Sequence, residues 1–313
     1  MISRRLLRIK ALTALYALNR REDEDLVKAE KELMFSIQKT YDLYHYIMLL
    51  ILEIADIAEE KIEQALQKKV PVPEDLNPNR RFVDNLVIAR LRNTPSFTRY
   101  ITSATLSWIN YYHIVRLLYK KITAWPVYEE YMKSPGNNYQ LDKKFIIQIL
   151  KGIFADSEDL AACLEEQSIY WNDDLEFVLM MIEKTLKRSQ ADEDKNIELM
   201  PLFKNEDDKD FIKILFRKSV LNNQKYSELI ERNTTNWELE RIALMDILVM
   251  RLAITEIIEF PEIPIRVTLN EYIEIAKYYC TSKSSTFVNG ILDNIVRELR
   301  GEGLIKKYGR GLI

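Results

Sequence analysis

Two neighbouring stretches near the end of the chain decide its fold: Thr268-Leu-Asn-Glu-Tyr-Ile-Glu-Ile-Ala-Lys277 and Ser284-Ser-Thr-Phe-Val-Asn-Gly-Ile-Leu-Asp293. In both, apolar residues recur three and four positions apart, which places them on one face of a helix. Thr268 and Glu271 have the spacing of a capping box, so the first helix is predicted to begin at Thr268. The stretches therefore predict two amphipathic helices joined by a short polar loop.

The composition of the whole chain predicts the same class of fold. The 313 residues include only seven glycines and nine prolines, while 47% are hydrophobic and 30% are charged. Few helix breakers together with abundant Leu, Ile, Glu, Lys and Ala are typical of an almost wholly helical, all-α protein. The length is sufficient for two domains, or for one domain with a large insertion.

Several classes of protein lack their usual signals in this sequence. Two cysteines and two histidines provide neither a disulfide framework nor a metal-ligand pattern, and this cysteine usage is typical of a reducing cytoplasm. We find no Gly-rich phosphate loop, nucleophile elbow or H-E-x-x-H pattern. The apolar run at 46–52 is too short to cross a bilayer, and the N-terminus does not resemble a signal peptide. We therefore expect a cytoplasmic protein without catalysis, cofactor, metal, membrane contact or small-molecule substrate.

The first helix, expected over residues 3–19 with Ser3 as its N-cap, carries an unusual charge pattern. Arg4, Arg5 and Arg8 fall within one arc of about 100°, and no acidic residue lies nearby in the sequence. Arginines at a helix N-terminus oppose the macrodipole, which favours carboxylates there. An RNA-binding face is one reason for a sequence to accept this cost, and a solvated helix end is the alternative.

The region after the first helix divides at polar segments. Helices are expected over 26–70, 79–133, 142–167 and 172–189, with a linker at 71–78 and an acidic connector from 189 to 210. A weak internal repeat aligns 142–171 with 208–237 without gaps and with six identities. Both a degenerate duplication and chance similarity between two helix pairs remain open.

The last hundred residues contain an acidic residue on a predicted apolar helix face and several basic residues near the C-terminus. Thr235 and Glu238 form a second capping box, which opens a helix whose apolar face is interrupted by Asp246. An unpaired carboxylate on such a face is costly, so Asp246 is expected to have a partner or to lie at the edge of a site. Basic residues near the C-terminus, Lys307 among them, are expected to form a flexible tail.

Three blocks in the final region, in this order, resemble the NusB family of bacterial transcription antitermination factors: Leu239–Ala253, Asn270–Lys277 and Phe287–Asp293. The first helix matches through its arginines and its Leu15-Tyr16 pair. The similarity covers residues 1–20 and about 208–313. It implies an antiparallel helical bundle in two packed subdomains. Residues 21–207 would then be an inserted helical region of unknown role, with the candidate repeat at 142–171.

The resemblance also implies a function. NusB proteins bind the single-stranded boxA RNA element together with ribosomal protein NusE, and this complex joins RNA polymerase in antitermination and ribosomal RNA synthesis. Carried over by position, the RNA contacts would be Arg4, Arg5, Arg8, Lys283, Ser284 and Phe287, and the partner contacts would be Tyr16 and Asp246. Leu6 and Thr286 stand where the family commonly has arginine and lysine, which weakens the expected RNA contact at these two places.

Each of these residues also has a structural interpretation. Phe287 lies in an apolar stripe and could be a core residue instead of a stacking surface for a base. Tyr16 could be mostly core, and Asp246 could be a structural partner of another buried group. The alternative function is a helical protein-interaction scaffold that has lost RNA binding. In that case the many aromatic residues of the central region would cover a protein interface.

Overall fold

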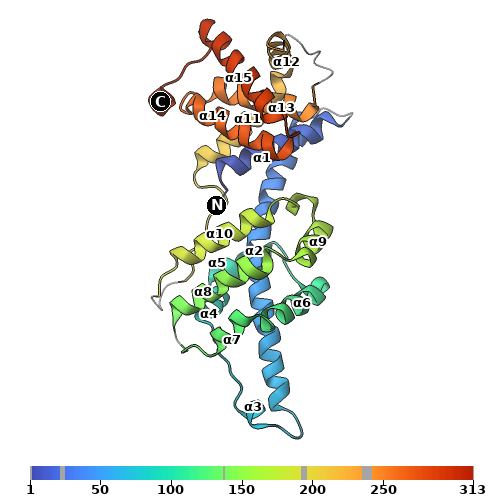
Figure 1. Cartoon of the computed structure of the whole chain (residues 1–313), viewed down its shortest axis with the longest axis vertical. Coiled ribbons are helices and arrows are strands. Elements are labelled where there is room, and N and C mark those ends of the chain that lie inside the picture. The colour runs from blue at the N-terminus through green and yellow to red at the C-terminus, as the bar shows by residue number, and fades with distance from the viewer. Residues whose placement is uncertain (1, 22–24, 137, 192–195, 235–241, 313) are drawn as a thin grey trace. The chain divides into compact units, whose positions relative to one another are not determined.

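The computed structural model describes residues 2–21, 25–136, 138–191, 196–234 and 242–312, and Figure 1 shows the path of the chain. These described residues contain no β-strand, which confirms the predicted all-α class. Contacts divide the chain into two compact units. Unit 1 comprises Met1–Ile37 and Leu202–Ile313, and unit 2 comprises Gln38–Pro201. Helix α2 (Leu26–Leu66) contributes residues to both units.

Unit 1 is built around one buried helix, α13 (Leu244–Glu259). Every residue of this helix from Asp246 to Ile257 is buried, as expected of a helix that is apolar nearly all round. The helices that pack against it are α1 (Arg4–Asn19), α11 (Glu206–Leu221), α12 (Asn223–Arg232), α14 (Ile265–Tyr279) and α15 (Ser284–Gly301). Helices α1 and α14 therefore both pack against this buried helix (Figure 1).

The two stretches that decide the fold form the predicted helix pair, α14 and α15, which pack against each other. The predicted capping box at Thr268 is wrong, because α14 begins earlier, at Ile265. Thr268 is buried, and its hydroxyl donates a hydrogen bond of 2.8 Å to Glu256 on α13. Glu271 accepts hydrogen bonds from Arg5 on α1. Both side chains make tertiary contacts, which sequence spacing cannot distinguish from caps. The other predicted capping box, at 235–238, lies outside the described residues.

Helix α1 closely matches its prediction. Ser3 is the N-cap, and its hydroxyl oxygen accepts a hydrogen bond of 3.3 Å from the backbone N–H of Leu6. Leu7 and Leu12 are fully buried where α1 packs on α11 and α13. Just before the helix, the backbone N–H of Ile2 donates to a carbonyl of unit 1 at 3.1 Å. The turns that carry the arginines are therefore held firmly on the core.

Unit 2 contains the remainder of α2 and a series of shorter helices: α3 (Pro73–Leu76), α4 (Leu86–Arg92), α5 (Pro95–Ser103), α6 (Tyr112–Thr123), α7 (Pro126–Met132), α8 (Tyr139–Ile149), α9 (Glu158–Gln167) and α10 (Leu175–Arg188). The segment 71–78, predicted as a linker, contains the one-turn helix α3. The Asp75 carboxylate stabilises this turn, because it accepts a hydrogen bond of 3.0 Å from the backbone N–H of Val72.

Aromatic side chains tie α2 to the rest of unit 2. The ring of Tyr46 stacks on Trp108 and on Trp171, with centroids 4.1 and 5.5 Å apart. The indole N–H groups of both tryptophans donate to backbone carbonyls of α2, at 3.0 and 2.8 Å. Buried indoles with satisfied donors are core residues. These tryptophans are therefore not part of an aromatic interaction surface.

The two segments of the internal repeat each contain a pair of helices, α8 with α9 in unit 2 and α11 with α12 in unit 1. The aligned residues Asp142 and Asp208 are both buried. Each pairs with an arginine, Asp142 with Arg81 and Asp208 with Arg4. The duplication itself stays a prediction.

Candidate nucleic-acid interface

Arg8 lies in the interior of unit 1, in an ion pair with Glu256. The Arg8 side chain is 4% exposed and that of Glu256 is 0% exposed, and two hydrogen bonds of 2.7 Å join guanidinium to carboxylate. The hydroxyls of Thr268 and Tyr272 donate to the same carboxylate at 2.8 and 3.3 Å. Burial by itself lowers the pKa of Arg8, but hydrogen bonding to Glu256 and its charge outweigh burial and raise this pKa. RNA contact by Arg8 would require this buried pair to break.

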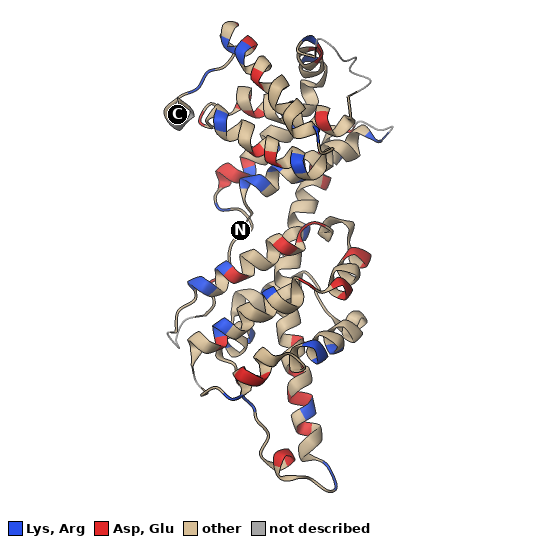
Figure 2. Cartoon of the chain, viewed as in Figure 1, with Lys and Arg blue, Asp and Glu red and all other residues tan. Residues whose placement is uncertain are grey.

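Arg4 and Arg5 remain partly exposed, although each has a carboxylate partner. The Arg4 Nε donates to Asp208 at 2.9 Å, and Arg5 donates two hydrogen bonds, of 2.9 and 2.8 Å, to Glu271. The arginine side chains are 34% and 52% exposed. The hydrogen bonds from Arg5 lower the pKa of Glu271. Figure 2 shows these basic and acidic segments side by side at the start of α1. Exposed ion pairs are weak, so the guanidinium group of Arg5 can exchange its carboxylate for a phosphate, whereas the partner of Arg4, Asp208, is itself largely buried.

A pocket of about 620 Å³ opens beside these arginines. One side is formed by the start of α1, and the other by the turn that leads into α14. The residues that line it are Ser3, Arg4, Arg5, Arg8, Glu262, Ile263, Pro264, Val267 and Glu271. Single-stranded RNA is held by basic groups on its phosphates and by flat or apolar surfaces against its bases. The pocket combines both kinds of surface, because arginine side chains and the apolar residues Ile263, Pro264 and Val267 line the same concavity.

The acidic partners of the arginines come from distant parts of the chain, namely α11, α13 and α14. They lie at the N-terminal end of α1, where the helix macrodipole favours negative charge. These carboxylates therefore offset the cost of placing three arginines there. The arginines have no acidic neighbours in the sequence, as predicted, and their partners are supplied by distant helices.

Glu256 is the residue of this site that sequence reasoning missed. It is a fully buried carboxylate in the most apolar helix of unit 1, and such a group is costly unless it is paired. The same argument was applied to Asp246 on this helix and holds equally for Glu256. Asp208 and Glu271 gave no comparable signal, because each lies on an amphipathic helix with other polar residues nearby.

Asp246 and Ser284 contact each other away from the pocket. Both are buried, and the Ser284 hydroxyl donates to Asp246 Oδ2 at 2.9 Å. The other carboxylate oxygen, Oδ1, is buried and accepts no hydrogen bond from any described residue. Asp246 thus has the partner that its position requires, and its carboxylate also interacts with the nearby thiol of Cys280, whose pKa is raised by burial and by this hydrogen bond. Its role in partner binding, and that of Ser284 in RNA binding, stay predictions.

Lys283 and Phe287 lie with Ser284 at the start of α15 and do not line the arginine pocket. Lys283 is exposed, and Phe287 is intermediate between buried and exposed. Asp246, which Ser284 contacts, lies about 15 Å along α13 from Glu256 at a rise of 1.5 Å per residue. The structure therefore separates the predicted RNA contacts into one group on α1 and another at the start of α15.

Tyr16, the other predicted partner contact, lies at the surface of α1. Its side chain is 37% exposed, and the guanidinium carbon of Arg20 lies 5.3 Å from the centre of its ring. This geometry is a cation–π contact. The ring is therefore accessible to a partner, and is not the core residue of the alternative interpretation.

The basic C-terminal segment, expected to be flexible, is attached to the turn that follows α13. Lys307 Nζ donates to the carbonyl of Phe260 at 2.8 Å, and the backbone N–H of Tyr308 donates to that of Pro261 at 3.2 Å. The next residues of this turn, 262–264, line the arginine pocket. The segment therefore holds positive charge at the border of the pocket.

Metal centres and membrane spans are two further features that a helical protein can carry. No group of three or more His, Cys, Asp or Glu side chains among the described residues could hold a metal ion. No helix within the same residues is both long and apolar enough to span a membrane.

The fold and the pocket define a class of all-α proteins in which a basic, partly apolar pocket lies beside a buried central helix. A family model described as the NusB family matches residues 175–297. The protein named "Transcription antitermination protein NusB" from Salinibacter ruber is 43% identical over 114 residues, which are 36% of this chain and 71% of the relative. The chain belongs to the NusB family.

Two further relatives carry the same name. The protein from Chloroherpeton thalassium is 45% identical over 34% of this chain and 50% of its own length, and that from Natranaerobius thermophilus is 40% identical over 28% and 64%. No solved structure matches the chain. The family consists of transcription antitermination factors, a class without enzymatic activity, and this confirms the prediction that the protein is not an enzyme.

Proposed function

We propose that this protein is an RNA-binding transcription antitermination factor. It binds boxA-type single-stranded RNA together with ribosomal protein NusE and acts in the cytoplasm, in an antitermination complex with RNA polymerase on ribosomal RNA genes. The observation that carries the proposal is the pocket lined by Arg4 and Arg5 in a chain of the NusB family. These two side chains can reach phosphates, while Arg8 fixes α1 through its buried pair with Glu256.

We also propose the domain organisation of a NusB-like domain, residues 1–20 and 208–313, interrupted by an inserted helical region, residues 21–207. The contact units divide the chain after Ile37 and before Leu202. The family match begins at Leu175, the first residue of α10, which belongs to unit 2. A deletion that removes most of unit 2 should therefore keep α10 as well as α11.

The direct test of the RNA proposal is a binding titration with the purified full chain. A boxA-like RNA and a scrambled RNA of the same length are compared, each with and without NusE. We expect preference for boxA, tighter binding with NusE, and an affinity that falls with salt because phosphate contacts release counterions. Equal, weak binding of both RNAs at all salt concentrations contradicts the proposal.

The carboxylate of Glu271 competes with RNA for Arg5, and this leads to a prediction. Glu271→Gln removes the partner of a half-exposed arginine and one negative charge from the pocket. Because exposed pairs contribute about 0.2–1 kcal/mol, RNA affinity should rise by a factor between about 1.4 and 5 in a fluorescence titration. Glu231→Gln on α12, an exposed residue that does not line the pocket, is the control of equal charge and should leave the affinity unchanged.

A scaffold that has lost RNA binding is the second candidate function. The observation that favours it is that Arg4, Arg5 and Arg8 all have carboxylate partners within the chain. Capture of partners from a cell lysate, with and without nuclease treatment, separates the two candidates. Partners that persist after nuclease, together with no affinity for boxA RNA, favour the scaffold.

A further inference from the structure

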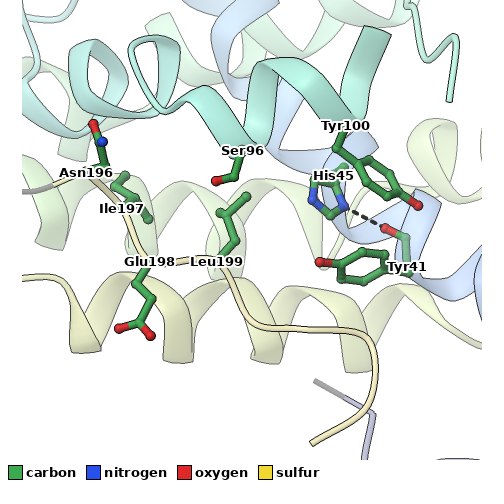
Figure 3. Close-up of a pocket in the computed structure, with 8 residues that line it drawn as sticks. All are labelled: Tyr41, His45, Ser96, Tyr100, Asn196, Ile197, Glu198 and Leu199. Atoms are coloured by element: carbon green, nitrogen blue, oxygen red, sulfur yellow. Dashed lines mark hydrogen bonds between the residues drawn. The ribbon is translucent and has the colours of Figure 1, made fainter. Parts of the chain in front are cut away.

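A second pocket lies entirely within unit 2, between α2, α5 and the extended segment 196–199 (Figure 3). Its volume of about 440 Å³ is in the range of small-molecule sites. Tyr41 and His45 on α2 and Tyr100 on α5 form an aromatic end, and Ile197 and Leu199 form an apolar side. Neither the family match nor the arginine pocket assigns a role to this place.

The extended segment that closes the pocket is fixed by hydrogen bonds at both ends. The backbone N–H of Ile197 donates to the Thr94 hydroxyl at 3.3 Å. At the other end, the Tyr41 hydroxyl donates to the carbonyl of Met200 at 3.0 Å, and the Met200 N–H donates to the Tyr44 hydroxyl at 3.4 Å. The pocket is therefore already formed in the absence of a ligand, which reduces the entropic cost of binding.

His45 supplies a hydrogen-bond acceptor at the aromatic end. The residue is 1% exposed, and its Nδ1 lies 2.9 Å from the carbonyl oxygen of Tyr41. A carbonyl only accepts, so Nδ1 carries the proton and Nε2 is the acceptor. Burial lowers the pKa of His45 to about 4, which keeps the ring neutral near pH 7. Figure 3 shows the second ring nitrogen turned away from that carbonyl, towards the side of Leu199.

The other polar groups of the pocket are neutral or directed elsewhere. The side chains of Ser96 and Asn196 make no hydrogen bond with any described residue, and Figure 3 shows the Ser96 hydroxyl directed into the space beside Leu199. The carboxylate of Glu198 points away from His45 in the same view. None of the described lining residues is Lys or Arg. The pocket therefore lacks the cations that a phosphate or carboxylate requires.

We propose that this pocket binds a neutral, planar nitrogen heterocycle of nucleobase type. A ring N–H of the ligand donates a hydrogen bond to His45 Nε2. The Ser96 hydroxyl and the Asn196 amide form hydrogen bonds with polar atoms on another edge of the ligand ring. The faces of the ring pack against the tyrosine and leucine side chains. Bases are recognised in this way elsewhere, by stacking on aromatic rings and by hydrogen bonds to their edges. This proposal does not rest on RNA binding by unit 1.

The test titrates adenosine, guanosine, cytidine and uridine against the full chain, with saturation-transfer NMR as the readout. At least one nucleoside should bind saturably to the wild type. His45→Phe keeps an aromatic ring but removes the acceptor, and should weaken that binding about five- to tenfold, the effect of one lost hydrogen bond. Ser96→Ala changes an exposed hydroxyl without a described partner, so it should fold normally, and it should weaken binding several-fold.

The matched control is His113→Phe, the same substitution at an exposed histidine of unit 2 that does not line the pocket. It should bind like the wild type. The proposal is overturned when no nucleoside binds, when His45→Phe and Ser96→Ala both bind like the wild type, or when His113→Phe loses as much affinity as His45→Phe.

Two sources of the ligand have this chemistry, a free nucleoside and a base of single-stranded RNA. Photo-crosslinking with RNA that contains 4-thiouridine, followed by peptide mapping, distinguishes them. Crosslinks to the peptide that carries Ser96 and Tyr100 identify RNA as the source. Nucleoside binding without such crosslinks identifies a free nucleoside. Failure of boxA binding in unit 1 leaves both readouts intact, so the two proposals can fail separately.

Discussion

Arg8→Ala is expected to lower the free energy of unfolding of unit 1 by about 3–5 kcal/mol, the range found when one partner of a buried ion pair is removed. The substitution leaves the carboxylate of Glu256 at 0% exposure without its cation. Among the described residues, the hydroxyls of Thr268 and Tyr272 would be the only side-chain groups that still donate to it. Denaturant titration followed by circular dichroism measures the effect, with the transitions of the two units fitted separately.

Arg5→Ala is the matched control for this measurement, because it removes an arginine from the same helix whose side chain is 52% exposed. We expect a loss below about 1 kcal/mol, as for other exposed pairs. A loss of stability from Arg8→Ala no larger than that from Arg5→Ala would show that the Arg8–Glu256 pair is not a structural element. The result also affects RNA studies, because a variant that replaces all three arginines is expected to lose its fold together with any RNA contact.

The double variant Arg4→Ala/Arg5→Ala is expected to reduce affinity for boxA-like RNA by about 10- to 100-fold while the helical content stays unchanged. A hydrogen bond to a charged group contributes about 1.5–3 kcal/mol, and release of Asp208 and Glu271 offsets part of the two losses. The dependence of log affinity on log salt should become less steep by about 1.4, because each phosphate contact on a single strand contributes about 0.7.

Lys213→Ala/Lys225→Ala is the control of equal charge, since both lysines are exposed in unit 1 and neither lines the arginine pocket. Its affinity should fall only slightly, through the general loss of positive charge. Equal affinity losses in the two double variants would mean that the pocket has no special part in RNA binding. No loss in either would exclude α1 as an RNA contact and favour the scaffold.

Features that depend on local periodicity could be predicted from the sequence. The α14–α15 pair and the Ser3 cap of α1 follow from patterns within a few turns of helix, because helical geometry relates residues three and four positions apart. The arginine cluster was also visible, since its members are neighbours on one helix. The all-α class followed from the composition and was confirmed.

The partners of the arginines could not be predicted in this way. Arg4, Arg5 and Arg8 pair with residues 204, 266 and 248 positions away, and such long-range pairs leave no periodic trace. The capping box at Thr268 failed for the same reason, because the hydroxyl and the nearby carboxylate bind other helices. The pocket of unit 2 depends on an extended segment that crosses α2 and α5, so helical patterns contain no sign of it.

The complete burial of α13 has a consequence for measuring these effects. Water reaches the backbone amides of its buried middle turns, residues 250–257, only when the helices around them separate, so their hydrogen–deuterium exchange reports the opening of unit 1 as a whole. The exchange rates of the slowest amides of this helix therefore measure the free energy of opening of unit 1. Exchange measured at α13 in the Arg8→Ala and Arg5→Ala variants therefore gives the stability of unit 1 separately from that of unit 2.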